Sequence, residues 1–245
     1  MKIPQRLSEG YRAFLDDRLP IERSRYQKLA ETGQRPETMV IGCCDSRVSP
    51  EVIFDAHPGE LFVVRNVANL APPYAPTGFT HGVSGVLEYA VQLLKVKYII
   101  VLGHTHCGGI RAYIEHHNRL EPGDFIDNWI SLISPAAKAA EPCDGDTQAG
   151  FPARLEQASI VVTLDNLMTF PWIRSQVEQQ ELQLIGAYFD VALSRSTSQV
   201  PENSSSSTIS MGRRRRASPT PAVARKIDRG PLNVRESRSA CARER

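Results

Sequence analysis

Hydrophobic residues are arranged along this chain in short runs separated by stretches with helical spacing. Near-continuous apolar runs at 38–42, 60–66, 98–103 and 182–190 predict four buried strands. Between the second and third runs, apolar residues of 80–96 recur every three or four positions, which predicts a helix with one buried face. A helix between two buried strands indicates a βαβ unit. We therefore expect an α/β fold whose parallel sheet is flanked by helices on both faces.

Further helices are predicted on either side of this unit. Residues 7–31 carry apolar side chains at helical spacing, and Pro20 is expected to divide them into two helices. Helical periodicity also occurs at 109–120, 126–140 and 150–178. These segments provide enough helix to cover a parallel sheet.

The composition changes near residue 193. Eight of the 17 residues at 194–210 are serine, and four consecutive arginines follow at 213–216. Such a segment buries too little apolar surface to offset the entropy lost on ordering. We therefore divide the chain into one folded domain at 1–193 and a disordered, basic Ser/Arg-rich tail at 194–245, and we interpret the arginine run as part of a solvated tail.

Charge and cysteine content exclude several classes of protein. The net charge of +2 combines an excess of eight positive charges at 194–245 with an excess of six negative charges at 1–193, which is not the balance of a nucleic-acid-binding domain. No apolar stretch has the length of a secretory signal or a membrane span, so we expect neither. The odd number of cysteines, five, does not predict a disulfide framework. A reducing, cytoplasmic location is the simpler expectation.

Side chains that can bind a metal follow two of the predicted strands. The run at 38–42 ends in glycine and is followed by Cys43-Cys44-Asp45-Ser46-Arg47, and the run at 98–103 is followed by His104-Thr105-His106-Cys107. Functional groups collect beyond the carboxyl ends of the strands in an open parallel sheet. If the two strands are neighbours, both clusters lie at one edge of the sheet.

Spacing selects which of these side chains share a site. Along extended backbone, alternate residues lie on one face, so Cys43 and Asp45 point together. Beyond residue 103 the chain is expected to enter a helix, where residues three apart are neighbours, which pairs His104 with Cys107 and leaves His106 aside. Two thiolates and one imidazole suit Zn²⁺, which prefers nitrogen and sulfur ligands in tetrahedral geometry.

The role of Asp45 depends on Arg47. Three protein ligands with one open position are typical of catalytic zinc, whereas four permanent ligands are typical of structural zinc. Asp45 could occupy the fourth position as a metal ligand and close the site. Alternatively, Arg47 could hold its carboxylate in a bidentate ion pair and leave that position to water.

For other polar and small residues near these motifs, the sequence predicts a role less specifically. We expect Cys44 and Cys143 to be inert thiols and His106 to be a loop residue. Arg65 and Asn66, at the end of another predicted strand, either pin the site loops or are simply structural. Gly108 and Gly109 either permit a tight turn or let backbone N–H groups approach a bound anion at a helix start.

The two motifs resemble those of the β-class carbonic anhydrases, C-x-D-S-R and H-x-x-C. The stretch GELFVVRNVAN at 59–69 is also similar to the family, and the likeness extends from about residue 8 to about residue 192. The resemblance implies a parallel sheet of about four strands flanked by helices, in a homodimer or a dimer of dimers whose N-terminal helix reaches across to the partner subunit.

The same resemblance implies a chemistry and assigns residues to it. Cys43, His104 and Cys107 are expected to bind Zn²⁺, while Asp45 and Arg47 are the catalytic pair that opens the fourth position. Zinc-bound hydroxide would attack carbon dioxide and release bicarbonate, with Gly108 expected to contact substrate. Because two thiolates donate more charge than two imidazoles, we expect a less acidic zinc-bound water and a rate that rises with pH above neutral.

Two alternatives remain open from the sequence. The same zinc site could act on a related substrate such as CS₂ or COS, which the shape of the access path would decide. A zinc-binding protein without turnover is the other alternative, against which the intact Asp45 and Arg47 argue. The segment after Asp190 departs from the family, whose members continue with a Thr-Gly turn and another strand.

Overall fold

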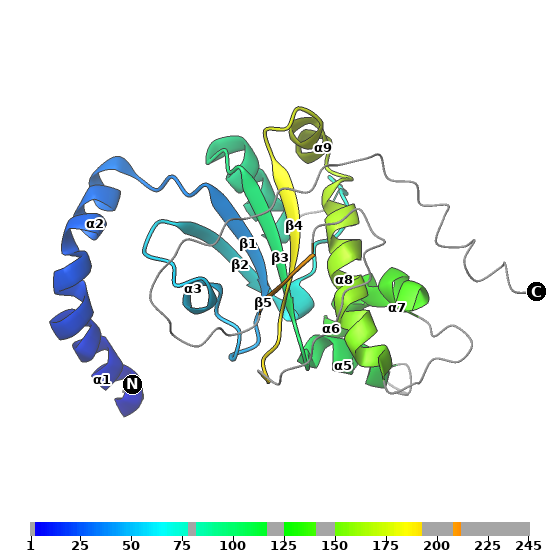
Figure 1. Ribbon diagram of the computed structural model, residues 1–245, viewed down its shortest axis with the longest axis horizontal. Coiled ribbons are helices and arrows are strands. Elements are labelled where there is room, and N and C mark those ends of the chain that lie inside the picture. Colours follow the sequence, from blue (N-terminus) through cyan, green and yellow to red (C-terminus); the bar gives the residue numbers. More distant parts are fainter. Residues whose placement is uncertain (1–2, 78–81, 117–124, 141–149, 193–207, 212–245) are drawn as a thin grey trace, which may run out of the picture.

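The computed structural model describes residues 3–77, 82–116, 125–140, 150–192 and 208–211 (Figure 1). Its centre is a twisted sheet with helices packed along it, and the N-terminal helices project away from the sheet on one side. Cys143 and the arginines at 213–216 lie outside the described residues. The element bounds below are those of the described part of the chain.

The sheet has five strands in the order β2-β1-β3-β4-β5, and all neighbouring strands are parallel. The strands are β1 (Thr38–Cys43), β2 (Leu61–Asn66), β3 (Tyr98–His104), β4 (Gln183–Phe189) and β5 (Thr208–Met211). The first four confirm the predicted strands to within one or two residues. Their apolar runs form strands because both faces of this sheet are covered by other residues of the chain.

The fifth strand departs from the prediction of a disordered tail. Thr208–Met211 pairs with Gly186–Phe189 along the edge of β4, where backbone N–H and C=O groups would otherwise lack partners. Backbone pairing of this kind depends little on side-chain composition, which is why a serine-rich segment gave no signal for it. The rest of the predicted tail, 194–207 and 212–245, lies outside the described residues.

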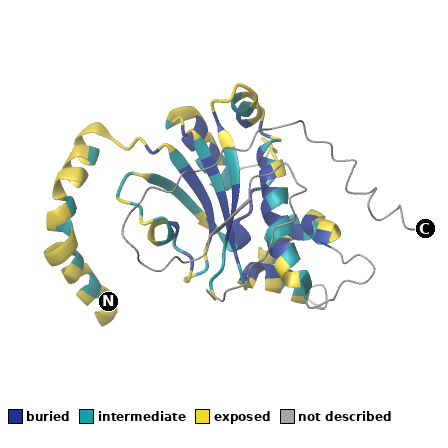
Figure 2. Ribbon diagram, viewed as in Figure 1, coloured by how far each residue is buried: buried dark blue, intermediate teal, exposed yellow. Residues whose placement is uncertain are grey.

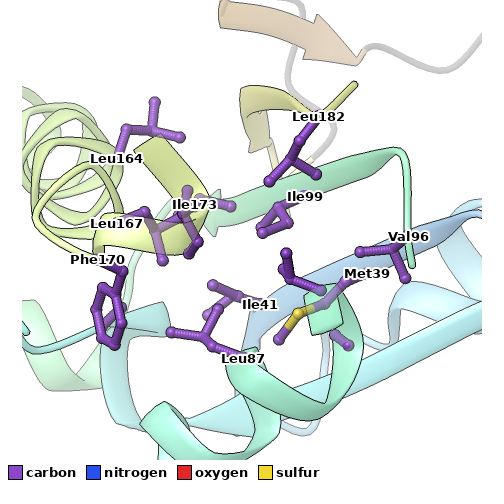
Figure 3. Close-up of a cluster of buried hydrophobic side chains, with 14 of the residues drawn as sticks. Met39, Ile41, Leu87, Val96, Ile99, Leu164, Leu167, Phe170, Ile173 and Leu182 are labelled. Carbon is purple, nitrogen blue, oxygen red and sulfur yellow. The ribbon is translucent and has the colours of Figure 1, made fainter. Parts of the chain in front are cut away.

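One face of the sheet carries the largest hydrophobic core. Helices α4 (Gly82–Glu88), α8 (Phe151–Leu167) and α9 (Pro171–Glu178) contribute to it, and Figure 3 shows their side chains meeting those of β1 and β3. Alternate strand residues point to this face, among them Met39, Ile41 and Ile99, and all three are fully buried. The other face buries Val40 and Leu102 near the short helix α3 (Pro50–Ile53).

A second core lies beyond the carboxyl ends of the strands. It is built from α5 (Gly108–His116), α6 (Ile126–Ile130), the 3₁₀ turn Ser131–Ile133 and α7 (Ser134–Ala140), packed against α8. Cys43 and Cys107 belong to this core. It is therefore the part of the fold that encloses the predicted metal ligands.

Several predicted helices are divided in the structure. The segment 126–140 contains a 3₁₀ turn, and 150–178 is broken before Pro171, which becomes the first residue of α9. Proline suits a first helical turn because it lacks the backbone N–H that an interior position needs. The predicted helix at 80–96 ends in a π-helical turn, Tyr89–Leu93, and 117–120 of the predicted 109–120 helix lies outside the described residues.

The N-terminal arm, defined here as residues 5–32, is one continuous helical rod. It consists of α1 (Gln5–Ala13), a π-helical turn (Phe14–Arg18) and α2 (Leu19–Thr32), and none of its residues is buried (Figure 2). The break predicted at Pro20 is wrong. The wide π turn just before that proline accommodates its ring, so the helix continues instead of ending.

Among the described residues, none of the helices is both long and apolar enough to cross a membrane.

Candidate metal centre

The predicted ligands meet where the order of strands reverses. The chain runs from β1 to one neighbour, β2, and then returns to the other side of β1 as β3. Ligands of open parallel sheets bind at such a switch point, beyond the carboxyl ends of the strands. Cys43 is the last residue of β1 and His104 is the last residue of β3, so the reversal alone brings these two side chains together.

Cys43, His104 and Cys107 form one buried group. Their ligand atoms all lie within 4.8 Å of one another, and the two sulfur atoms are 3.9 Å apart. The predicted convergence of these three residues is confirmed. Two sulfurs and one imidazole nitrogen facing a common point form the donor set that tetrahedral zinc prefers.

The orientation of His104 fits a metal at this point. Its Nδ1 lies 2.9 Å from the backbone oxygen of Thr105, and this contact fixes the ring. Its Nε2 is buried and has no hydrogen-bond partner among the described residues. A buried nitrogen without a hydrogen-bond partner is costly unless it binds a ligand. A histidine that binds a metal through one ring nitrogen commonly donates the N–H of the other to a backbone carbonyl or carboxylate, which is the arrangement that Nδ1 and Thr105 can form here. The residues present therefore fit a zinc ion.

The two thiols influence each other's protonation. A hydrogen bond from Cys107 lowers the pKa of Cys43, and the same contact together with burial raises the pKa of Cys107. The pair thus loses one proton readily and retains the other, because two bare thiolates in contact would repel. A divalent cation removes that repulsion and releases the remaining proton.

Asp45 is held by Arg47 in a bidentate ion pair. The guanidinium donates from Nε to Oδ1 at 2.9 Å and from its terminal nitrogen to Oδ2 at 2.7 Å, and the Arg47 backbone N–H adds a third bond. These bonds hold the pKa of the Asp45 carboxyl well below its usual range. Asp45 Oδ2 lies 4.0 Å from His104 Nε2, close to the ligand group but outside it.

The structure shows Asp45 in the ion-paired arrangement, the second of the two considered from the sequence. Both carboxylate oxygens are bound by Arg47, so Asp45 is paired with the guanidinium in this structure. Arg47 also donates to the backbone oxygen of His106, which joins the two motifs. His106 itself is an exposed turn residue, in agreement with the prediction.

Residues at the end of β2 hold the first ligand loop, defined here as Cys43 to Arg47. Arg65 donates to the backbone oxygens of Cys43 and Asp45, at 2.9 and 2.7 Å. The Asn66 side chain brackets the following turn by donating to, and accepting from, the backbone of Leu70. Of the two alternatives for Arg65 and Asn66, the structure shows the one in which they pin the site loops.

The second ligand loop, defined here as His104 to Cys107, is formed by a turn and not by the predicted helix. Thr105 and His106 lie between β3 and α5, and His106 has a φ of +56°, an uncommon conformation for a residue with a side chain. This turn brings Cys107 back beside His104. The pairing was predicted correctly, but the helical spacing from which it was inferred is not how the chain achieves it.

The two glycines that follow Cys107 have different environments. A Cβ on Gly109 would lie 2.7 Å from Val67 Cγ1 and 2.9 Å from Ala68 Cβ, so that glycine permits close packing. A Cβ on Gly108 would meet nothing within 4 Å. Gly108 is exposed as the first residue of α5, which leaves its surroundings open to a small ligand.

One buried acidic residue at this site was not predicted. Glu156 of α8 is 6% exposed, and its Oε1 accepts a hydrogen bond from the Cys107 backbone N–H at 3.0 Å. A signal was present in the sequence, because the apolar residues Ile160, Leu164 and Leu167 follow Glu156 at helical spacing. Glu156 therefore lies on the buried face of its helix, where an acidic residue is unusual.

A buried sulfur–sulfur–nitrogen group at the switch point of a parallel sheet defines a zinc protein of the α/β class. A family model described as carbonic anhydrase matches residues 38–195. β-Carbonic anhydrase 3 of Arabidopsis thaliana is 34% identical over 189 residues, which cover 76% of this chain and 72% of that protein. The chain therefore belongs to the β-carbonic anhydrase family, whose members are zinc-dependent lyases that catalyse the reversible hydration of carbon dioxide.

Other relatives and solved structures agree with this assignment. The chloroplastic β-carbonic anhydrase 5 of A. thaliana is 34% identical over 75% of this chain, although the match spans only 60% of that protein. The β-carbonic anhydrase CcaA superimposes with a TM-score of 0.70 at 29% identity, over 77% of this chain and 90% of that one. A Coccomyxa β-carbonic anhydrase in complex with acetazolamide gives a TM-score of 0.67 at 27% identity, over 78% and 84%.

Proposed function

We propose that the chain carries out carbon dioxide hydration at the Cys43, His104 and Cys107 group, with Asp45 and Arg47 as its catalytic pair. The observation that carries this proposal is the combination of a complete, buried donor set and a carboxylate that is held beside it but not in it. Bound zinc would supply Lewis acidity toward water. The protein must then orient the reacting groups and exclude competing ones.

Asp45 is suited to orient the attacking nucleophile. Its carboxylate stays ionised across the neutral range because Arg47 lowers its pKa, so it can only accept hydrogen bonds. A carboxylate 4.0 Å from the free nitrogen of His104 is placed to accept a bond from a small molecule in the remaining position of the group. Such a bond would turn a lone pair of the nucleophile toward carbon dioxide.

Gly108 is placed to bind the bicarbonate anion through backbone N–H groups. It begins a helix of nine residues, where backbone N–H groups lack intrahelical partners and favour anions. Among the described residues, a Cβ added to Gly108 would meet no atom within 4 Å apart from its chain neighbours and its own helix. We assign to Gly108 a backbone contact with the substrate or product.

Stopped-flow measurement of carbon dioxide hydration, together with a zinc assay, tests the site. We expect one zinc per wild-type chain, and we expect Cys43→Ser to lose the metal and to slow hydration by more than the roughly 100-fold that follows loss of a residue behind a ligand. Cys44→Ser is the matched control, because that thiol is adjacent but exposed, and it should retain both properties. Wild-type protein that holds zinc without hydrating carbon dioxide would contradict the proposed function.

We also propose that the protein is a homodimer in which the N-terminal arm packs on the partner subunit. Exposed apolar side chains along the arm support this, with Leu7 and Tyr11 each 63% exposed and Ile21 82% exposed. Two β-carbonic anhydrases from Sordaria macrospora are described as tetrameric, and one superimposes on this chain with a TM-score of 0.60 at 29% identity, over 78% of this chain and 90% of that one. A dimer of dimers is the next assembly to consider.

A reducing compartment, the cytoplasm, is our proposal for location. It is supported by the free thiols of Cys43, Cys44 and Cys107, two of which must remain unoxidised to bind zinc.

A further inference from the structure

Glu156 is a buried acidic residue that the proposed chemistry does not use. It lies on α8 and is 6% exposed, and burying a carboxylate is costly unless its oxygens are hydrogen-bonded. Oε1 accepts the backbone N–H of Cys107, and Oε2 accepts the hydroxyl of Tyr188. Each oxygen therefore has its own donor, from a different element of the fold.

Both partners of Glu156 donate a hydrogen bond to its carboxyl group. Burial and the neighbouring Glu156 raise the pKa of Tyr188, so its hydroxyl remains protonated. The backbone N–H of Cys107 lies just before α5, where the helix dipole favours a negative group. Each carboxyl oxygen therefore accepts one bond from a donor fixed elsewhere in the fold.

These bonds connect three elements around one zinc ligand. Tyr188 is on β4, Glu156 is on α8, and Cys107 precedes α5. Helix α8 is itself fixed against the sheet, because Ile160 packs so closely on Gly103 that a Cβ there would lie 2.6 Å from its Cδ1. A carboxylate held on this helix thus has a defined position relative to β3 and β4.

The contact fixes the peptide from which the ligand sulfur projects. Glu156 binds the N–H of Cys107, and the Cys107 carbonyl accepts the N–H of Arg111 in the first turn of α5. With both sides of the residue held, its Cα–Cβ bond has a defined direction. That direction places Sγ 3.9 Å from the sulfur of Cys43.

We propose that Glu156 and Tyr188 form a positioning pair that presents Cys107 to zinc and slows the loss of the metal. The pair touches neither the substrate nor the metal, and it acts only through the backbone of Cys107. This inference rests on the proposed zinc site. An apolar residue at 156 would fill the same space at lower desolvation cost, so a buried carboxylate at this position indicates a role beyond packing.

The test measures the metal site directly. Full-length zinc-loaded wild type, Glu156→Leu, Glu156→Gln and Tyr188→Phe are mixed with excess chelator, and the rate of zinc transfer is followed. Cobalt-substituted samples report the thiolate-to-cobalt charge-transfer band. Thr163→Val is the matched control, because Thr163 is buried on the same helix and its hydroxyl has no partner among the described residues.

We expect Glu156→Leu to release zinc about 10- to 100-fold faster than wild type, as is typical when a group that orients a metal ligand is removed. Glu156→Gln keeps an acceptor for the Cys107 N–H and should recover most of this loss. Tyr188→Phe should fall between Glu156→Gln and Glu156→Leu and shift the cobalt band, while Thr163→Val should match wild type in both measurements.

Two outcomes would overturn the inference. One is wild-type zinc release and an unchanged cobalt band in folded Glu156→Leu. The other, which decides the matter if Glu156→Leu does not fold, is wild-type zinc release and an unchanged cobalt band in Tyr188→Phe. Failure of the proposed function is distinguishable, because it would appear in wild type itself, either as absence of bound zinc or as bound zinc without carbon dioxide hydration, and the second case leaves the comparison of zinc release intact.

Discussion

The metal centre and the N-terminal arm differ in how far their side chains are buried. At the centre, Cys43, His104 and Cys107 are 1–4% exposed, and hydrogen bonds to Arg65 and Glu156 hold the backbone of the two cysteines. Along the arm no residue is buried, and large apolar side chains face outward. The three candidate ligands of the centre lie on one chain, whereas the arm has apolar surface that the described part of its own chain does not cover.

The arm is attached to the domain by a small set of contacts. Glu22 lies 3.2 Å from His57, Arg25 lies 3.1 Å from Glu60, and Leu29 packs where Gly59 leaves room for it. Exposed ion pairs of this type contribute little to stability. The comparison therefore predicts that damage to the arm changes assembly, whereas damage to the centre changes chemistry.

The largest expected effect comes from placing charges on the apolar face of the arm. Leu7→Glu combined with Tyr11→Glu should convert a dimer into a monomer, raising the dissociation constant on the order of 1000-fold, because unpaired charges are costly in an apolar interface. Light scattering coupled to size exclusion measures this. Zinc content should not change, since the ligands come from one chain.

Glu9→Lys is the control for the arm variant. Glu9 lies on the opposite side of the helix from Leu7, so reversing its charge should leave the dimer intact. A wild-type chain that is monomeric at every concentration tested would show that the exposed arm has no partner of its own kind.

At the centre, Asp45→Asn separates metal binding from turnover. The variant should retain zinc, because Asp45 is outside the ligand group, and should hydrate carbon dioxide roughly 100-fold more slowly or worse. Glu60→Gln removes an ion-paired carboxylate beside the arm instead, and its hydration rate should equal that of wild type. Loss of zinc from Asp45→Asn would mean that Asp45 is a ligand after all.

A smaller effect is expected from two neighbouring glycines. Gly109→Ala should lower the free energy of unfolding by about 1–3 kcal/mol, because its Cβ would collide with Val67 and Ala68. Gly108→Ala places the same methyl group in open space and should leave stability nearly unchanged. Denaturant titration of the pair measures the difference, and equal losses would show that the second ligand loop is not closely packed.

The ligands were predictable from the sequence because residues that follow a predicted parallel strand can be placed at one edge of the sheet. Apolar runs located β1 and β3, and residues just beyond two neighbouring parallel strands must share an edge. The spacing between His104 and Cys107 was sufficient to pair them, but the left-handed turn at His106 was not predictable, since a histidine there has no local signal for positive φ.

Other features were missed for different physical reasons. The π turn before Pro20 and the break before Pro171 depend on how neighbouring turns accommodate a proline, and sequence patterns do not distinguish the two outcomes. Strand β5 is held by backbone pairing, which leaves little trace in side-chain periodicity. Glu156 was overlooked because an acidic residue in a helix usually faces solvent, even though its helical neighbours are buried.

The smallest expected effect concerns how each region responds to acid. Arg47 is the main cause of the lowered pKa of Asp45, so the stability from this pair is fully present above the ordinary aspartate pKa of about 3.9 and is lost as pH falls toward the lower folded value. The pKa of Glu60 is lowered mainly by the His57 backbone N–H, with Arg25 contributing less.

Thermal unfolding of zinc-depleted wild type, Arg47→Gln and Arg25→Gln between pH 7 and pH 2 tests this difference. The gap in Tm between wild type and Arg47→Gln should be at most about 2 °C, because the guanidinium is partly exposed, and it should narrow progressively below about pH 4 as pH approaches the lowered pKa of Asp45. Arg25→Gln should change the pH dependence less, since the backbone bond to Glu60 remains. A gap for Arg47→Gln that persists unchanged to pH 2 would mean that Arg47 stabilises the loop through its bond to the His106 carbonyl and not through the ionised carboxylate.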